Sequence, residues 1–256
     1  MKKHPPTQEL LLLQLRAKAN RARFSENPYP GEVIIVGLDE SGENLVQLYA
    51  IMAQNEKNRN RVLSVEDGRL FTEAADPNKV EDPSLIIYNA MLEEDDQTDR
   101  TAVVSNGHQT GDVASGIFRG MGFAPMLREW KYEPDSPNFT PRITAASSWL
   151  GGGAMLIDMS LLRKSVFSDA CDRHFYEFDN VGRGFGYCFH TYFGDGKPLP
   201  PFHGEPYLVP LLGGADDIAK AYWEVLNVDN RVSLAVKFIP NKGPSAITVI
   251  NKYKKV

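Results

Sequence analysis

The chain contains 256 residues, of which 42% are hydrophobic, and it carries a formal net charge of −5 at pH 7. This length and hydrophobic content are sufficient for a large core, and we expect one large domain rather than two small ones. The acidic balance argues against a nucleic-acid partner, because phosphate backbones are bound by summed basic charge. An anionic ligand therefore requires a local basic cluster.

Cysteine and histidine usage argues against a disulfide scaffold and against a metal site. Cys171 and Cys188 are the two cysteines, too few for either. His174, His190 and His203 lack partners at metal-ligand spacing. A reducing cytoplasm fits this composition best.

No apolar run approaches the length of a membrane span. The Leu run of residues 10–13 is followed by charges where a signal peptide would have a small-residue cleavage site. We therefore expect a cytoplasmic protein with no membrane partner.

Strand patterns dominate the chain after a helix predicted near residues 7–23. Residues 32–38 and 44–53 are separated by a turn rich in Asp, Ser and Gly, which is typical of a hairpin. Further strands are predicted over 61–65, 69–74, 84–91, 101–105, 127–133, 142–150, 154–160, 173–178, 186–193, 232–239 and 246–252.

Helices are scarce. A second helix is predicted over 215–227, where apolar residues share one face, and a third after residue 112. Residues 193–206, rich in Gly and Pro, predict a long, stiff surface loop. Many strands, few helices and no strict βαβ alternation indicate an α+β fold with mainly antiparallel sheets.

The segment "VVSNGHQTGD", residues 103–112, passes from an apolar strand into an uninterrupted run of polar residues and glycines. Asn-Gly is a strong turn signal, and Thr110 or Asp112 is suited to cap the helix suggested by "VASGIF". The other interpretation is a ligand-contacting loop.

Two shorter motifs also carry candidate functional side chains. Arg59 and Arg61 stand two apart before a predicted strand, so in extended chain both guanidinium groups would project to one face and form a fork for phosphate. A solvated basic turn is the alternative. Tyr88 and Asn89 end an apolar run and must point to opposite faces of a strand, one of them toward a core or cleft. A tyrosine bonded to a backbone carbonyl is the simpler interpretation.

Residues 129–143 form the richest stretch. Glu133 ends a predicted strand beside Trp130 and Tyr132, and Pro134 and Pro137 then stiffen a loop. That loop carries Asn138, Thr140 and Arg142. It is either a rigid ligand-binding loop or an ordinary connection between strands.

Seven motifs, in order and spacing, resemble the IMP cyclohydrolase-like family, typified by the archaeal IMP cyclohydrolase. They are "NPYPGEVIIVGLDESGENLVQLYAIM", "NRNRV", "DPSLIIYNAM", "VVSNGHQTGD", "YEPDSPNFTPRI", "GDGKPLPPFHGEP" and "LNVDNRVSLAVKF". The likeness runs from about residue 27 to the C-terminus. It implies an N-terminal helical extension over 1–26 and a single family domain over 27–256.

The resemblance implies a four-layer α-β-β-α sandwich similar to the N-terminal-nucleophile hydrolases, without their autocatalytic nucleophile. It also implies closure of 5-formamidoimidazole-4-carboxamide ribotide to inosine monophosphate (IMP) in purine biosynthesis. The partner is then a small-molecule purine ribotide and no cofactor is needed. A homo-oligomer stays open.

The family motifs imply roles for individual residues. Tyr88 would donate to the formyl oxyanion, Glu133 would orient or deprotonate the carboxamide, and Arg59 or Arg61 would be the third catalytic group. The nucleotide would be lined by Asn89, Asn106, Gln109, Thr110, Asn138, Thr140 and Arg142.

Three positions depart from the family pattern. The family commonly has Arg after "YPG" and an "RS" pair ahead of "NR", whereas this chain has Glu32, Gln54 and Asn55. If the family arginines bind the 5′-phosphate, their loss weakens affinity for a ribotide. A hydrolase or cyclase acting on another purine-like or ribosyl substrate, or a non-catalytic nucleotide-binding protein, therefore stays open.

Overall fold

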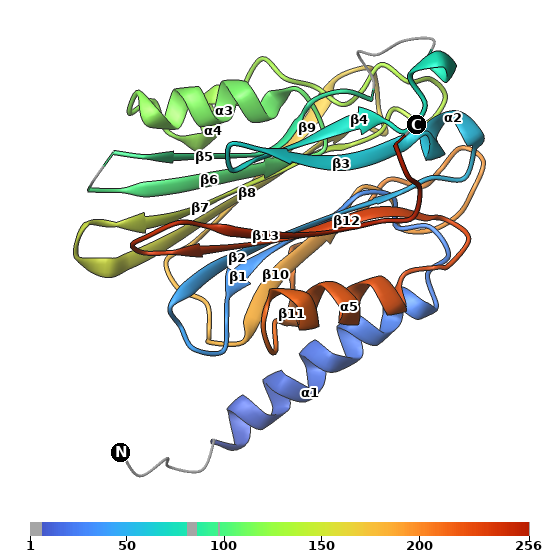
Figure 1. The fold of residues 1–256 in the computed structure, drawn as a ribbon. Helices are drawn as coiled ribbons and strands as arrows, with labels where there is room; N and C mark the ends of the chain where they lie inside the picture. Colours follow the sequence, from blue (N-terminus) through green and yellow to red (C-terminus); the bar gives the residue numbers. More distant parts are fainter. Residues whose placement is uncertain (1–6, 81–85, 97, 256) are drawn as a thin grey trace.

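Two antiparallel sheets lie face to face in this computed structural model, which describes residues 7–80, 86–96 and 98–255 (Figure 1). Within these residues the first sheet has the strand order β11-β10-β1-β2-β12-β13 and the second the order β3-β4-β5-β6-β7-β8-β9. Every pairing is antiparallel. The prediction of mainly antiparallel sheets with few helices is therefore confirmed.

The first sheet comprises β1 (Val33–Leu38), β2 (Asn44–Met52), β10 (Phe185–His190), β11 (Tyr207–Pro210), β12 (Arg231–Pro240) and β13 (Ala246–Asn251). The second comprises β3 (Arg61–Glu66), β4 (Arg69–Ala74), β5 (Asn89–Asp95), β6 (Arg100–Ser105), β7 (Arg142–Leu150), β8 (Ala154–Lys164) and β9 (Cys171–Phe178). Residues 84 and 85 of the strand predicted over 84–91 lie outside the described residues.

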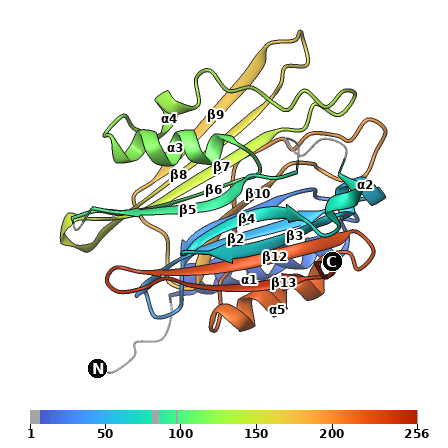
Figure 2. The same cartoon turned by 45° about the horizontal axis from the view of Figure 1, so that its top comes forward.

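Helices cover the outer faces of both sheets. Helices α1 (Gln8–Ala22) and α5 (Ala215–Val225) lie beneath the first sheet, and Figure 2 shows α3 (Gln109–Phe118) and α4 (Phe123–Met126) on the outer face of the second. The short helix α2 (Glu56–Arg59) connects β2 to β3. Among the described residues no helix is long and apolar enough to cross a membrane.

The central strands of the first sheet are buried on both faces, as β1 illustrates. Ile34 and Val36 pack into the core between the sheets, whereas Val33 and Ile35 pack against the layer of α1 and α5. Because side chains alternate along a strand, an uninterrupted apolar run supplies both contacts.

A buried polar cluster joins the two sheets. The Lys237 Nζ of β12, fully buried, lies 2.6 Å from Glu93 Oε2 of β5. Arg100 of β6 pairs with the same carboxylate and donates to the carbonyls of Pro240 and Gly243. Burial alone would raise the pKa of Glu93, but the Lys237 ammonium and the hydrogen bonds hold it below its ordinary value.

Three local predictions are wrong. Residues 127–133 form no strand, because the chain leaves α4 there in turns and the carbonyl of Trp130 accepts from the Arg173 guanidinium rather than from a neighbouring strand. Neither Thr110 nor Asp112 caps α3, which already begins at Gln109. Residues 193–206 are more than a surface loop, since Leu199 and Phe202 are buried.

Candidate active site

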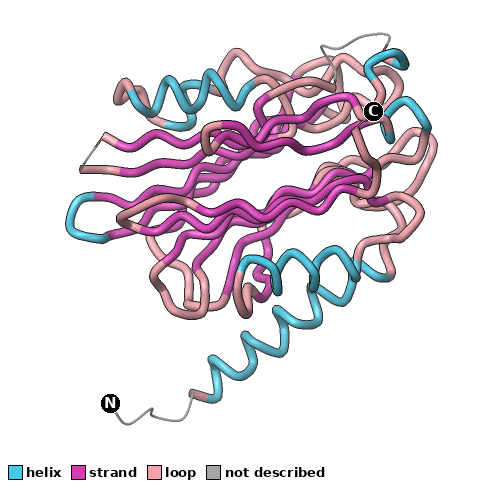
Figure 3. The backbone as a smooth tube through the Cα atoms, viewed as in Figure 1, coloured by secondary structure: helices cyan, strands magenta, loops and turns pink. Residues whose placement is uncertain are grey.

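Helix α2 and many connecting loops gather at one end of the sheets (Figures 1 and 3), and β3, which begins with Arg61, starts there. In an antiparallel sheet the start of one strand lies beside the end of its neighbour. The segments that precede β1, β3, β5 and β7 therefore meet those that follow β2, β6 and β10. Residues distant in the sequence are brought together in this way.

A cavity of about 590 Å³ opens at this end. Both sheets and two proline-containing loops contribute to it. Its lining includes Tyr29, Glu32, Gln54, Asn55, Arg61, Glu133, Asp135, Asn138, Thr140, Tyr192 and Lys197. The volume is within the range of small-molecule sites.

Glu133 and Arg142 form a largely buried ion pair beside this cavity. The Glu133 N–H donates to the carbonyl of Thr140 at 2.8 Å, which closes the proline loop and fixes the carboxyl position. Glu133 Oε1 lies 3.2 Å from Arg142 Nη1, which also donates to Gln109 Oε1 at 3.0 Å. A Cβ on Gly107 would lie 2.3 Å from Arg142 Nη1, so only glycine leaves room for this arrangement.

Burial raises the pKa of Glu133 to about 8. The Arg142 guanidinium opposes this rise, whereas the carboxylates of Glu32 and Asp135 add to it. The carboxyl group therefore gains and loses its proton near neutral pH, as a general base or acid must.

Arg61 and Tyr88 lie close to this pair. Arg61, the first residue of β3, is buried, and its Nη1 lies 3.6 Å from Glu32 Oε1. The Tyr88 Oη lies 2.7 Å from Tyr49 Oη. Burial raises the pKa of Tyr88 although the Arg61 guanidinium opposes it, so the phenol stays protonated at neutral pH and can donate a hydrogen bond.

Tyr88 faces a second, smaller cavity of about 380 Å³. Asn89 and His108 also line it, and the His108 ring lies edge-on to Tyr88 at 6.0 Å. Tyr88 still interacts electrostatically with Arg61, Glu32 and Glu133. Tyr88 therefore lines the smaller cavity and interacts electrostatically with residues of the larger one.

Arg59 does not join the cluster, and the expectation that Arg59 and Arg61 share a face is wrong. Arg59 is the last residue of α2, and its Nε donates to the carbonyl of Ala53 at 3.1 Å. Asn60 ends the helix between the two arginines, so the extended geometry that would align them is lost. Of the two, Arg61 lines the cavity.

Asn106, Gln109 and Thr110 are buried and bonded to the protein itself. Asn106 Oδ1 accepts from the Ile143 N–H at 2.9 Å and its Nδ2 donates to the carbonyl of Pro141 at 3.0 Å. Thr110 Oγ1 donates to the carbonyl of Gly107 at 2.8 Å. These bonds join the end of β6 to the start of β7 and hold Arg142 in place.

The proline loop presents Asn138 and Thr140 to the cavity. Asn138 Oδ1 accepts from the Leu199 N–H at 3.2 Å, and Thr140 Oγ1 bonds to Asp135 and to the Tyr192 hydroxyl. The loop of residues 193–206 is thereby tied to the proline loop.

Sequence reasoning missed several lining residues. Tyr29 and Tyr192 stack with ring centroids 5.8 Å apart, and Lys197 and Asp135 supply charges of opposite sign. The motif "GDGKPLPPFHGEP" contains Lys197 and was the available signal for it. Tyr29 stands between two prolines in the first family-like motif, which was the available signal for it. Tyr192 carried none, because it lies in the segment predicted as a strand over 186–193.

The three departures from the family pattern all line the cavity and all have partners. Glu32 pairs with Arg61, the Gln54 Nε2 donates to Asp195 Oδ1 at 2.8 Å, and Asn55 Oδ1 accepts from the Asn58 N–H at 2.8 Å. In the part of the chain that the structure describes, no group of three or more His, Cys, Asp or Glu could hold a metal ion.

No curated protein sequence matches the chain at a significant level. The family model described as IMP cyclohydrolase-like protein matches residues 29–243, a range that contains Arg61, Tyr88, Glu133 and Arg142. Helix α1 lies before the matched range. Since the match spans most of the chain, the protein belongs to the IMP cyclohydrolase-like family.

Proposed function

We propose that the protein is an IMP cyclohydrolase of purine biosynthesis that closes 5-formamidoimidazole-4-carboxamide ribotide to IMP with loss of water. One observation carries this proposal: a buried carboxyl, Glu133, has a pKa of about 8 and lies against Arg142, at a cavity that Arg61 lines. Family membership supports it. The proposed setting is the cytoplasm, with no cofactor.

The reaction needs positioning, one proton acceptor and one proton donor. The carboxamide nitrogen attacks the formyl carbon, a C–N bond forms, and the nitrogen loses a proton. The formyl oxygen gains a proton, and the resulting hydroxyl leaves as water with a second nitrogen proton. Both reacting groups belong to one substrate, so holding them in contact supplies much of the rate enhancement.

Glu133 is the proposed acceptor of the carboxamide proton. Its ionised form is a stronger base than an exposed carboxylate, because burial destabilises the charge. The hydrogen bond that the Glu133 N–H donates to the Thr140 carbonyl and the ion pair with Arg142 hold the carboxyl in one place. Such positioning is what a general base requires.

Tyr88 is the proposed donor to the formyl oxyanion. Its protonated hydroxyl is bonded to Tyr49, and the Arg61 guanidinium lies close enough to stabilise negative charge. A buried donor of this kind stabilises an oxyanion more strongly than water does, since it needs no reorganisation. Arg61, rather than Arg59, is therefore the arginine that we assign to the reaction.

The remaining predicted residues take two roles in this proposal. Asn89, Asn138 and Thr140 contact the ribotide from the cavity linings. Asn106, Gln109 and Thr110 act indirectly by holding Arg142 and Gly107.

The stacked sheets with helices on both outer faces support a relation to N-terminal-nucleophile hydrolases. We also propose residues 1–26 as an extension to one domain over 27–256.

The charges that line the cavity of about 590 Å³ favour a second candidate function. Its lining carries the carboxyls of Glu32, Glu133 and Asp135 but only the cations Arg61 and Lys197. This excess of carboxyl groups over cations disfavours the binding of a 5′-phosphate. A cyclase or hydrolase acting on an uncharged purine-like or ribosyl substrate is therefore the alternative.

Incubation of the purified protein with the formamido ribotide tests the proposal, with IMP separated and quantified chromatographically. We expect IMP to form without any added cofactor. The formamido riboside is run in parallel, because turnover of the riboside alone would favour the second candidate. Binding of the ribotide without turnover would instead indicate a non-catalytic nucleotide-binding protein.

A further inference from the structure

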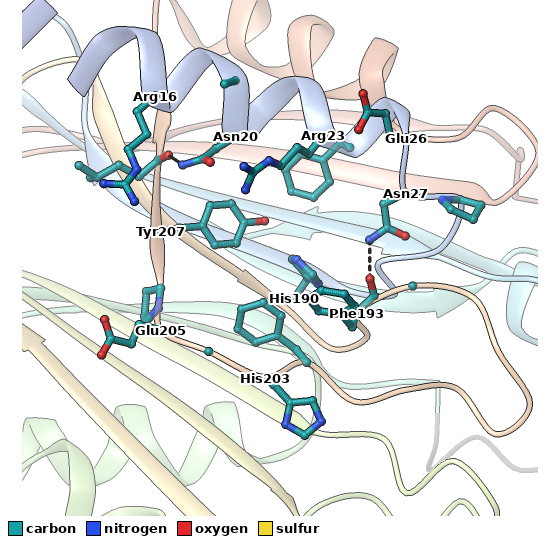
Figure 4. Close-up of a pocket in the computed structure, with 18 of the residues that line it drawn as sticks. Arg16, Asn20, Arg23, Glu26, Asn27, His190, Phe193, His203, Glu205 and Tyr207 are labelled. Atoms are coloured by element: carbon teal, nitrogen blue, oxygen red, sulfur yellow. Dashed lines mark hydrogen bonds between the residues drawn. The ribbon is translucent and has the colours of Figure 1, made fainter. Parts of the chain in front are cut away.

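A larger cavity, of about 820 Å³, lies between α1 and the segment that leads into β11 (Figure 4). Arg16, Asn20 and Arg23 line it from one side of the α1 segment, because residues three, four and seven apart share a helix face. Asn20 Nδ2 donates to the carbonyl of Leu208 at 2.8 Å and so fixes α1 over this cavity. None of its lining residues lines the candidate active site.

Aromatic rings form the wall of this cavity. The rings of His190 and Phe202 have centroids 4.5 Å apart, and Phe24 and Tyr207 each lie 6.0 Å from His190. All four residues line the cavity. A planar ring is the shape that such a wall accommodates best, since offset and edge-to-face contacts between rings are favourable.

His190 supplies a hydrogen-bond acceptor within this wall. Its Nδ1 lies 2.7 Å from the carbonyl oxygen of Tyr192, which can only accept, so Nδ1 carries the proton. Burial lowers the pKa of His190 to about 4, so the ring is neutral. The Nε2 atom is then an acceptor, and it has no hydrogen bond within the described residues. A ligand ring that carries an N–H group can donate the hydrogen bond that His190 Nε2 lacks.

The rim of the cavity carries charges suited to a phosphate and a sugar. The guanidinium groups of Arg16 and Arg23 are exposed, and neither makes a hydrogen bond or an ion pair with any residue that the structure describes. Arginine binds phosphate through charge-assisted, often paired, hydrogen bonds. Glu26 and Glu205 also line the rim, and carboxylates accept bonds from ribose hydroxyls.

We propose that this cavity binds a purine ribonucleoside monophosphate at a site separate from the candidate active site. The base lies against Phe202 and Tyr207 and donates to His190, and the phosphate meets Arg16 and Arg23. Arg16 and Arg23 precede the family-matched residues 29–243, whereas His190, Phe202 and Tyr207 lie within them, so the N-terminal extension supplies the phosphate side of this site. The inference does not depend on the reaction proposed above.

Isothermal titration of the full chain with adenosine 5′-monophosphate (AMP) tests the site, because AMP has the ring, the N–H donor and the phosphate. We expect a Kd below about 1 mM, with adenosine and inorganic phosphate each at least about tenfold weaker. Replacing both arginines, Arg16→Ala with Arg23→Ala, should weaken AMP binding at least about tenfold.

Lys18→Ala is the matched control, since Lys18 is an exposed cation of the same helix that does not line the cavity. It should leave the Kd for AMP within about twofold of the original value. Melting temperatures of all variants verify that α1 stays folded. Absence of AMP binding, or equal AMP affinity in the double variant and the control, would overturn the proposal.

Discussion

Replacing Glu133 by Gln separates its proposed catalytic role from a purely structural one. The amide keeps the shape of the side chain. Its oxygen can still accept a hydrogen bond from Arg142 Nη1, which lies 3.2 Å from Glu133 Oε1 in the original protein. It loses the basicity. We therefore expect ribotide affinity within a few fold of the original and single-turnover rates lower by about 10²–10⁴-fold, the usual contribution of a general base.

The pH dependence of the rate follows from the raised pKa of Glu133. If the ionised carboxyl takes the carboxamide proton, the rate should rise with pH and level off above about 8, where the group is ionised. The residual rate of Glu133→Gln should lack this rise.

Glu133→Gln should also change how the free energy of unfolding depends on pH. The folded state binds the Glu133 proton more tightly than the unfolded chain, so the original protein loses stability as pH rises from about 4.5 to about 8. The two pKa values set a ceiling of about 5 kcal/mol on this loss. Urea unfolding at pH 5 and pH 8.5 should show Glu133→Gln gaining about 2–5 kcal/mol relative to the original protein across that interval.

Glu129→Gln is the control for both experiments, because Glu129 is an exposed carboxyl of the same segment. It should change neither the rate nor the pH dependence of stability. Unchanged turnover in Glu133→Gln would remove Glu133 from the mechanism. Lower stability and affinity with an unaffected rate would instead make it an anchor of the proline loop.

Three further substitutions test the site and the fold. Tyr88→Phe should lower kcat by about 10²-fold or more with the fold retained, as expected for one oxyanion donor; a near-normal kcat would assign Tyr88 to the core. Arg61→Ala should weaken binding of the ribotide far more than that of the riboside, and equal losses measured by calorimetry would place Arg61 outside the phosphate site. Lys237→Ala leaves Glu93 with one cation fewer and should cost about 3–5 kcal/mol in urea unfolding without changing kcat per folded molecule; a stability loss below about 1 kcal/mol would contradict the assigned sheet-joining role.

Local patterns were sufficient to predict most of the strands. The strand predicted over 142–150 has the bounds of β7, because Ile143, Thr144 and Trp149 favour strands and every residue between its two ends is buried. The two aspartates that begin the helix predicted over 215–227 lie in the first turn of α5, where they favour the positive end of the helix dipole. In both segments local preference and tertiary packing agree.

Residues 127–133 show where local patterns fail. Trp130 and Tyr132 would share one face of a strand, yet Trp130 packs with Leu127, α3 and α4, while Tyr132 lies against Phe139. Each apolar contact is satisfied by a different neighbour, so no common face exists. Periodicity cannot reveal this, because it records only that the residues are apolar.

The site could be predicted only in part, because its residues meet through the topology of the sheets. Glu133 and Arg61 were identifiable from motifs, but nothing in the sequence near Gly107 indicates that Arg142 Nη1 occupies the space of its missing side chain. The partner of Arg61 was hidden in the same way, since Glu32 precedes a strand of the other sheet.

Glu32, one of the three departures from the family pattern, is held in the site by the residues around it. A carboxylate at this position pairs with Arg61, accepts from the Thr191 hydroxyl at 3.1 Å and raises the pKa of Glu133. An arginine there would repel Arg61 and would lower the pKa of Glu133 instead. Glu32 therefore makes Glu133 a stronger base, and if the proposed ribotide binds here, its phosphate must compete with Glu32 for Arg61.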